Sequence, residues 1–171
     1  DDKFLNWEAS HDGYSKNYGI SLDGEKYKGK PGLYPFKLVT SKGEVIYDVI
    51  YTLGKDGFRK DTNDFIKDIY VYGGSFVYGE GLKDNETLTH YLYADHNLPA
   101  KNVAYHGWGM HNALINVETL PITGSNGVNV LLTGPFHSLR SSCKHEWTGG
   151  HPKFLIFKGK INRAGVCGKP K

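Results

Sequence analysis

The sequence lacks any long hydrophobic run. Its longest apolar stretches, such as residues 128–132, are far shorter than the roughly 20 residues that a membrane-spanning helix needs. It also lacks a run of five like charges, and its 21 basic and 18 acidic residues are scattered and leave a net charge of only +3. We therefore expect neither a membrane span nor a nucleic-acid partner. The chain begins without methionine or a signal-like apolar segment, so we interpret it as a processed or excised form whose targeting signal has been removed.

Cysteine is scarce, with only Cys143 and Cys167 in the chain. A disulfide between them would close a loop of about 23 residues and add about 3 kcal/mol of stability on chain-entropy grounds. Such a bond would place the protein in an oxidising compartment, the periplasm or the cell exterior. The alternative is a metal site that also uses His145 and His151, although the spacing fits no C-x-x-C pattern.

No internal repeat divides the chain, and its 171 residues suit one domain with one core. With 39% hydrophobic residues, 22 glycines and 7 prolines, the composition is that of a loop-rich globular protein. Residues 1–67 form short polar segments broken by glycine, which predicts a β-rich N-terminal extension packed on the core. Within it, residues 36–39 and 45–51 flank Ser41-Lys42-Gly43 as a hairpin.

Residues 68–171 alternate strand and helix patterns, which predicts an α/β core with a parallel sheet. Short β-branched and aromatic runs predict strands at residues 69–72, 102–105 and 128–133. The tail from Ser138 onward is expected to hold one hairpin, around residues 154–160, and no helix.

Two helices are expected between these strands. The first is capped by Asp84 or Asn85 and extends to about residue 96, with Leu88, Tyr91 and Leu92 on one apolar face. The second lies within residues 110–120, because a proline follows at position 121 and apolar side chains recur at helical spacing. The apolar positions of the second helix are Met110, Ala113, Leu114 and Val117.

With right-handed crossovers, the loops that follow the three strands meet at the carboxyl edge of the sheet, where ligands usually bind. The first of these loops, residues 73–81, places Ser75 directly after a buried strand and two glycines. A serine on such a tight turn presents its hydroxyl at the sheet edge and its own N–H toward an oxyanion, which suits a nucleophile. The alternative is a structural or phosphate-binding turn, although the glycines match neither common phosphate-loop pattern.

The segment around Ser75 resembles the first block of the SGNH (GDSL-like) hydrolases. Gly73-Gly74-Ser75-Phe76 is followed by further matching positions, namely Gly79, Gly81, Asp84 and Glu86. Residues 102–112 are similar to the family's second block, in which Gly107 matches the glycine whose N–H enters the oxyanion hole. Residues 51–52 and 56–59 resemble a segment that often precedes the serine block in bacterial members, so the likeness covers roughly residues 47–140.

This resemblance implies a three-layer α/β/α, flavodoxin-like fold and a serine esterase or O-acyl (acetyl) transferase. The substrate class implied is an ester, commonly an acetyl group on a carbohydrate. Ser75 would be the nucleophile, and the N–H groups of Ser75 and Gly107 would hold the oxyanion. Such chemistry needs no metal and no organic cofactor, and we expect a bacterial protein of the periplasm or cell exterior.

The sequence differs from the family at three places. Gly74 stands where the family has Asp, and residues 134–137 stand where Gly-x-Asn-Asp would supply the third oxyanion donor. His137 with Arg140 is similar to a pair in members related to polysaccharide modification, so His137 is a candidate oxyanion donor or base. The Asp-x-x-His block that supplies the general base has no match in residues 138–171, so we expect the chain to end before it. His145 and His151 are the other candidate bases.

Aromatic and histidine side chains flank the two blocks. Tyr78, His106 and Trp108 are candidates for the wall of a sugar-stacking or acyl pocket, and ordinary packing is their alternative role. His111 is a further pocket candidate on the other side of Gly107. A second class of function is a non-catalytic relative that has lost catalytic residues and binds a glycan or a protein through the same edge.

Overall fold

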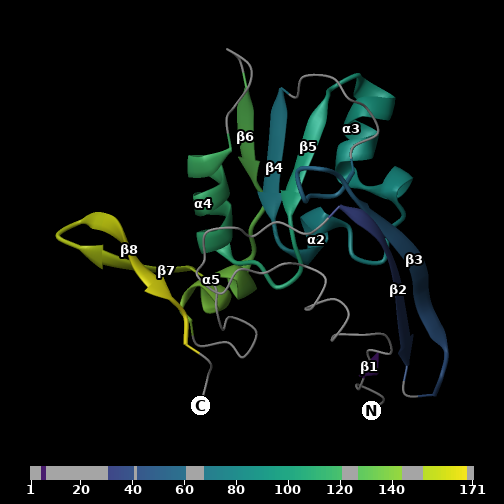
Figure 1. Ribbon diagram of the computed structural model, residues 1–171, viewed down its shortest axis with the longest axis horizontal. Coiled ribbons are helices and arrows are strands. Elements are labelled where there is room, and N and C mark those ends of the chain that lie inside the picture. Colours follow the sequence, from purple (N-terminus) through teal and green to yellow (C-terminus); the bar gives the residue numbers. More distant parts are fainter. Residues whose placement is uncertain are drawn as a thin grey trace.

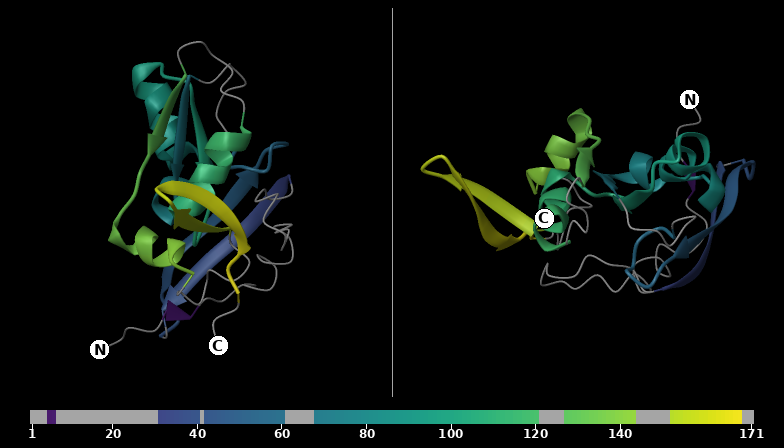
Figure 2. Two further views of the ribbon diagram at one scale, coloured as in Figure 1. Left: turned by 90° about the vertical axis from the view of Figure 1, so that its left-hand side faces the viewer. Right: turned by 90° about the horizontal axis from the view of Figure 1, so that it is seen from above.

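The computed structural model describes residues 5–6, 31–40, 42–60, 68–120, 127–143 and 152–168. These residues form a parallel sheet at the centre, an antiparallel sheet on one side and a two-stranded hairpin on the other (Figure 1). The views in Figure 2 show the two antiparallel elements at opposite ends of the molecule.

The central sheet has the strand order β5-β4-β6. In it, β4 (Ile69–Gly73) pairs in parallel with β5 (Ala100–Ala104) and with β6 (Val128–Leu131). All residues of β5 and all but the first of β4 are buried, which explains why β4 is a continuous apolar run without alternation. In β5 the buried residues include the polar Lys101 and Asn102. The prediction of an α/β chain with a parallel sheet is confirmed, with strand bounds shifted by one or two residues.

Helices follow each of these strands. After β4 come α2 (Ser75–Tyr78), a 3-10 turn η1 (Asp84–Glu86) and α3 (Leu88–His96). After β5 comes α4 (Met110–Thr119), within the predicted range. After β6 comes α5 (Pro135–Ser141), which the sequence analysis missed. The fixed φ of proline favours the first position of a helix, and this signal at Pro135 was the one available.

The start of α3 differs from the prediction. Its cap is Thr87, whose side-chain oxygen accepts a hydrogen bond from the N–H of His90 at 3.3 Å, and Asp84 lies in the preceding 3-10 turn. The predicted apolar face is also wrong in part. Leu92 packs against the core, whereas Leu88 and Tyr91 are exposed.

The buried face of α4 is rotated from the predicted one. Met110 and Val117 are exposed, while Ala113 is buried as predicted. Asn112 and Asn116 are both buried. The Oδ1 of Asn112 accepts the N–H of Gly109 at 3.0 Å, and Asn116 donates to the Asn112 carbonyl at 2.8 Å, while Nδ2 of Asn112 has no hydrogen-bond partner among the described residues. Because polar side chains occupy part of the buried face of α4, an apolar pattern does not reveal that face.

The N-terminal sheet contains β1 (Leu5–Asn6), β2 (Gly32–Thr40) and β3 (Val45–Leu53) in antiparallel order. The turn between β2 and β3 confirms the predicted hairpin. Phe36, Val49, Tyr51 and Leu53 belong to the same buried cluster as the residues of β4 and β5. This sheet therefore shares its core with the α/β part of the chain.

The last described element is the hairpin of β7 (Pro152–Phe157) and β8 (Lys160–Val166), as predicted for this tail. Cys143 and Cys167 form a disulfide that ties the end of β8 to the residues after α5. Because the two sulfurs are bonded to each other, the alternative metal site has no thiolates. His145 and His151 lie outside the described residues.

Across the described ranges, no helix combines the length and the apolar character that crossing a bilayer requires.

Candidate functional site at the carboxyl edge of the sheet

The loops after β4, β5 and β6 meet at one edge of the sheet. Arg140 on α5 donates from Nη1 to the carbonyl of Trp108, in the loop after β5, at 3.2 Å. Gly74, in the loop after β4, lies against both: a Cβ placed there would be 3.1 Å from the Trp108 oxygen and 3.1 Å from Nη1 of Arg140. Ser75 and Gly107 are each one chain position from these contacts, so the structure brings the two predicted loops together.

Gly74 has no room for a side chain. A Cβ at this position would lie only 2.7 Å from Nε2 of His137. The glycine at 74 and the histidine at 137, both of which differ from the pattern that the sequence resembles, are therefore sterically linked. The imidazole of His137 occupies the space into which a side chain at position 74 would project.

Ser75 begins α2 and is partly exposed, between the buried Gly74 and the exposed Phe76. Its carbonyl accepts hydrogen bonds from the N–H groups of Gly79 and Glu80, both at 3.0 Å. In the part of the chain that the structure describes, its hydroxyl makes no hydrogen bond with another side chain. A hydroxyl at the sheet edge that is not bound to a neighbour is available to an incoming ligand.

A buried arginine fixes the far end of α2. Arg59 is 1% exposed and pairs with Asp84 at 2.6 Å. It also donates to the carbonyls of Tyr78 and Gly79 at 3.2 and 3.3 Å and to that of Leu82 at 3.1 Å. The last carbonyls of a helix lack partners within the helix, and Arg59 supplies them for the helix that begins with Ser75. The sequence analysis matched residues 56–59 and Asp84 to the family but gave them no role.

A contact between Glu80 and His106 links the serine segment to the Gly107 loop. Oε2 of Glu80, which follows α2, lies 3.0 Å from Nδ1 of His106, and the Tyr47 hydroxyl donates to Oε1 at 3.0 Å. Burial alone would raise the pKa of Glu80, but hydrogen bonds from His106 and Tyr47, with nearby positive charge, hold it below the usual 4.5. Glu80 is thus ionised at neutral pH, and it positions the residue next to Gly107.

His137 is 4% exposed, and its hydrogen bonds determine its tautomer. Nδ1 accepts the N–H of Gly134 at 2.8 Å, so in the neutral ring the proton is on Nε2. Nε2 faces Gly74 and has no hydrogen-bond partner among the described residues. Burial, helped by the charge of Arg140, lowers the pKa of His137 below the ordinary 6.5. At neutral pH His137 is therefore a buried, uncharged donor with an unused N–H.

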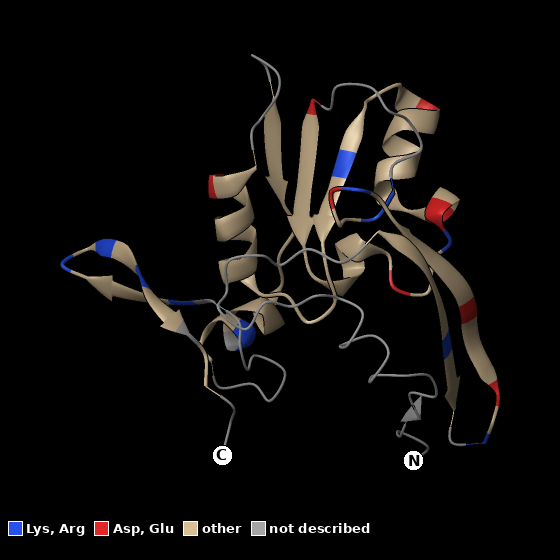
Figure 3. Ribbon diagram, in the orientation of Figure 1, with Lys and Arg blue, Asp and Glu red and all other residues tan. Residues whose placement is uncertain are grey.

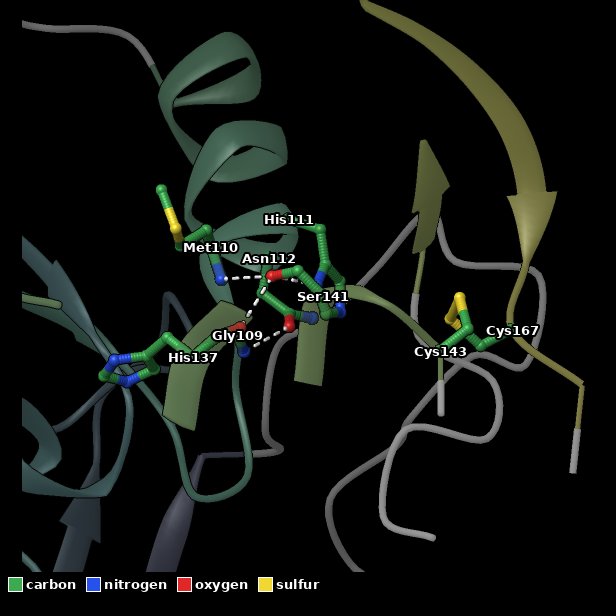
Figure 4. Close-up of a disulfide and its surroundings, with 8 residues drawn as sticks. All are labelled: Gly109, Met110, His111, Asn112, His137, Ser141, Cys143 and Cys167. Atoms are coloured by element: carbon green, nitrogen blue, oxygen red, sulfur yellow. Dashed lines mark hydrogen bonds between the residues drawn. A yellow bond between two sulfur atoms is a disulfide. The ribbon is translucent and has the colours of Figure 1, made fainter. Parts of the chain in front are cut away.

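Ser141 joins α5 to the start of α4 (Figure 4). Its Oγ donates to the His137 carbonyl at 2.9 Å, accepts the N–H of Met110 at 3.0 Å and lies 3.0 Å from Nδ1 of His111. His111 is 4% exposed. It is part of this helix junction.

Two of the three residues predicted for the aromatic pocket wall are buried. Tyr78 and Trp108 are buried and stack around Tyr105, with ring centroids 5.5 and 5.1 Å from it. The side chain of His106 is 13% exposed. Tyr78 and Trp108 are core residues, which was the alternative role.

One pocket of the described residues lies between α2 and α5, beside Gly74. It measures about 210 Å³. Its lining consists of Gly74, Phe76, Val77, Leu132, Thr133, Gly134, Phe136 and His137. The rings of Phe76 and Phe136 lie 5.6 Å apart at this position. Phe136 was missed because the helix that carries it was not expected.

Comparisons of the chain with protein-family models, with curated proteins and with solved structures gave no match.

Proposed function

We propose that the protein is a serine esterase or O-acyl (acetyl) transferase that acts on an ester, with a carbohydrate acetyl ester as the expected class. The observation that supports this most is the unused Nε2–H of His137 beside Gly74, directly before Ser75. A buried N–H without a partner costs free energy unless a ligand completes it. A developing oxyanion is such a ligand, and it would lie where the loops after β4, β5 and β6 converge.

In the proposed reaction, the Ser75 oxygen attacks the ester carbonyl and its proton passes to a base. The carbonyl becomes an oxyanion that accepts hydrogen bonds from the N–H groups of Ser75 and Gly107 and from His137 Nε2. The bond from carbon to the leaving oxygen then breaks, and the leaving alcohol takes up the proton. Water regenerates the serine in an esterase, and a sugar hydroxyl does so in a transferase.

The tautomer favours the donor role of His137 over the base role. A general base needs a nitrogen with a free lone pair facing the serine, and the lone pair of Nδ1 is already used by Gly134. A neutral histidine that donates through Nε2 replaces the amide donor of the family's Asn without adding charge to the site. This assignment leaves His145 and His151 as the bases that the sequence suggests.

The proposal also includes a three-layer SGNH fold and a location in an oxidising compartment. Right-handed crossovers in the order β5-β4-β6 would place α3 and α4 on opposite faces, as in a three-layer SGNH domain. The disulfide favours an oxidising compartment, the periplasm or cell exterior of a bacterium.

A binding protein without catalysis is the second candidate. Phe76 is 79% exposed and its ring lies beside that of Phe136, which gives the edge an aromatic surface of the kind that sugar rings stack on. In this case Ser75 would contact a ligand without reacting with it.

Covalent labelling distinguishes the two candidates. A serine-directed fluorophosphonate, followed by peptide mass mapping, should modify Ser75 in the native chain. The Ser75→Ala variant should stay unlabelled, and so should a heat-unfolded sample. If the folded native protein takes up no label at Ser75, the enzymatic proposal fails and the binding role is favoured.

The activity should depend on the N–H that His137 donates. His137→Ala should lower kcat for p-nitrophenyl acetate by about a hundredfold to a thousandfold with little change in KM, because a lost oxyanion donor costs that much. His137→Gln, which restores an N–H donor, should recover part of kcat. Circular dichroism controls for folding. Equal activity of the alanine and glutamine variants would contradict the donor role.

A further inference from the structure

The β7–β8 hairpin has features that the proposed reaction does not use. It projects from the body of the protein, on the side away from β2 and β3 (Figures 1 and 2). Near its tip, Ile156 is 79%, Phe157 66% and Ile161 63% exposed. Clustered apolar side chains of this size at the surface of a soluble domain usually mark an interaction site.

The same hairpin is uniformly basic. Its charged residues are Lys153, Lys158, Lys160 and Arg163, and residues 152–168 contain no Asp or Glu. Figure 3 shows blue segments along this hairpin and no red, whereas the β2–β3 hairpin has both colours. A concentration of positive charge on one element attracts an anionic surface.

The strand register places both apolar and basic side chains at the tip of the hairpin. Ile156 pairs with Ile161, and Phe157 pairs with Lys160. Because cross-strand partners share a face, one face at the tip is aliphatic and the other joins an aromatic ring to an ammonium group. Lys158 lies over the Phe157 ring, with Nζ 5.5 Å from its centroid. Cations therefore surround the apolar tip.

The base of the hairpin is held to the body. β7 contacts α4, and the disulfide between Cys143 and Cys167 ties the end of β8 to the chain just after α5. The hairpin is thus an arm with a fixed base, connected to the helix that carries His137.

The geometry points to docking of this hairpin on an anionic lipid bilayer. The tip side chains Ile156, Phe157 and Ile161 enter the boundary between headgroups and acyl chains, while the surrounding lysines contact lipid phosphates. A second copy of this chain fits less well, because two basic hairpins would face each other with like charge. An anionic polysaccharide would match the charge but offers no apolar medium for the tip.

Vesicle binding tests the proposal on the whole chain. In sedimentation assays, the protein should bind vesicles of 30% phosphatidylglycerol in phosphatidylcholine and leave pure phosphatidylcholine vesicles largely unbound. Binding should fall steeply between 0.1 and 1 M NaCl, since the Debye length falls from about 10 to about 3 Å. A Phe157→Trp variant should shift its fluorescence to the blue on binding, which reports insertion and not mere adhesion.

Substitutions separate the contributions of charge and apolar contact. Lys158→Gln with Lys160→Gln should weaken partitioning about 25-fold, at about fivefold for each cation removed. Ile156→Ser with Phe157→Ser should weaken it at least about tenfold. The matched control, Leu33→Ser with Ile50→Ser on the other hairpin, removes exposed apolar side chains too and should bind as the native chain does.

Three results would overturn the proposal: equal binding to zwitterionic vesicles, equal losses in the control and hairpin variants, or vesicle binding without a fluorescence shift. A dimer that the serine variant of the hairpin dissolves would also overturn it and assign the hairpin to a second copy. None of these measurements involves Ser75, so they are independent of the esterase proposal.

Discussion

Replacement of Ser75 by alanine should lower the rate of p-nitrophenyl acetate hydrolysis by about a thousandfold or more. The acyl group has no other acceptor at this edge if Ser75 is the nucleophile, and loss of the nucleophile in serine hydrolases costs several orders of magnitude. KM should change little, because the pocket and the oxyanion donors remain. Steady-state kinetics of the purified chain measure the effect.

Ser138→Ala is the matched control for this experiment. Ser138 is exposed on α5, close in sequence to His137, and its hydroxyl donates to the Pro135 carbonyl at 2.6 Å. Its replacement should leave kcat within about twofold of the native value, since an exposed surface change is worth little. A Ser75→Ala protein that is folded and keeps its activity would exclude Ser75 as the nucleophile.

Replacement of Arg59 by methionine should lower the free energy of unfolding by about 3 to 5 kcal/mol. The substitution leaves the carboxylate of Asp84, 30% exposed, without its partner at 2.6 Å. It also removes the donor to the carbonyls of Tyr78 and Gly79 at the end of α2. Buried groups that lose one partner cost much more than the pair contributes in net stability. Urea unfolding followed by tryptophan fluorescence measures the loss.

The Lys37→Met variant tests whether burial is the reason for the large loss of stability expected when Arg59 is replaced. Lys37 pairs with Asp48 at 3.3 Å, but the two side chains are 44% and 61% exposed. Solvent screens such a pair, so its loss should cost less than about 1 kcal/mol. Similar losses in the Lys37 and Arg59 variants would show that the Arg59 network is not the stabilising element proposed here. Arg59→Lys should fall between them, because a lysine keeps the charge but not the fork of donors.

Local sequence patterns predicted the secondary structure well for those elements whose formation depends on a single segment of the chain. The runs that become β4 and β5 and the helical range of α4 could be found from the sequence because chain-local spacing and turn residues determine them. Prediction was weaker for properties that depend on contacts with a distant part of the chain. The burial of Leu88 or Met110 depends on which element covers it, and α5 was missed because its only signal was one proline.

The candidate site, too, could be predicted from the sequence only in part. The sequence was enough to predict that the loops carrying Ser75 and Gly107 meet, since parallel strands bring their carboxyl ends to one edge. The role of Ser75 stays a prediction. It was not enough to separate pocket residues from core residues among Tyr78, His106 and Trp108, because all three types occur in both places. The sequence did not indicate that Arg59 is buried, where it donates to carbonyls at the end of α2.

What the sequence alone determined is the α/β pattern with a parallel sheet, a serine after the first core strand, and the two cysteines available for pairing. Tertiary structure alone decided that His137 fills the space beside Gly74 and that its neutral ring carries the proton on Nε2. The reason is physical: a periodic pattern records which face of a segment is apolar, whereas a tautomer, a pKa and a pocket depend on atoms from loops that are far apart in the chain.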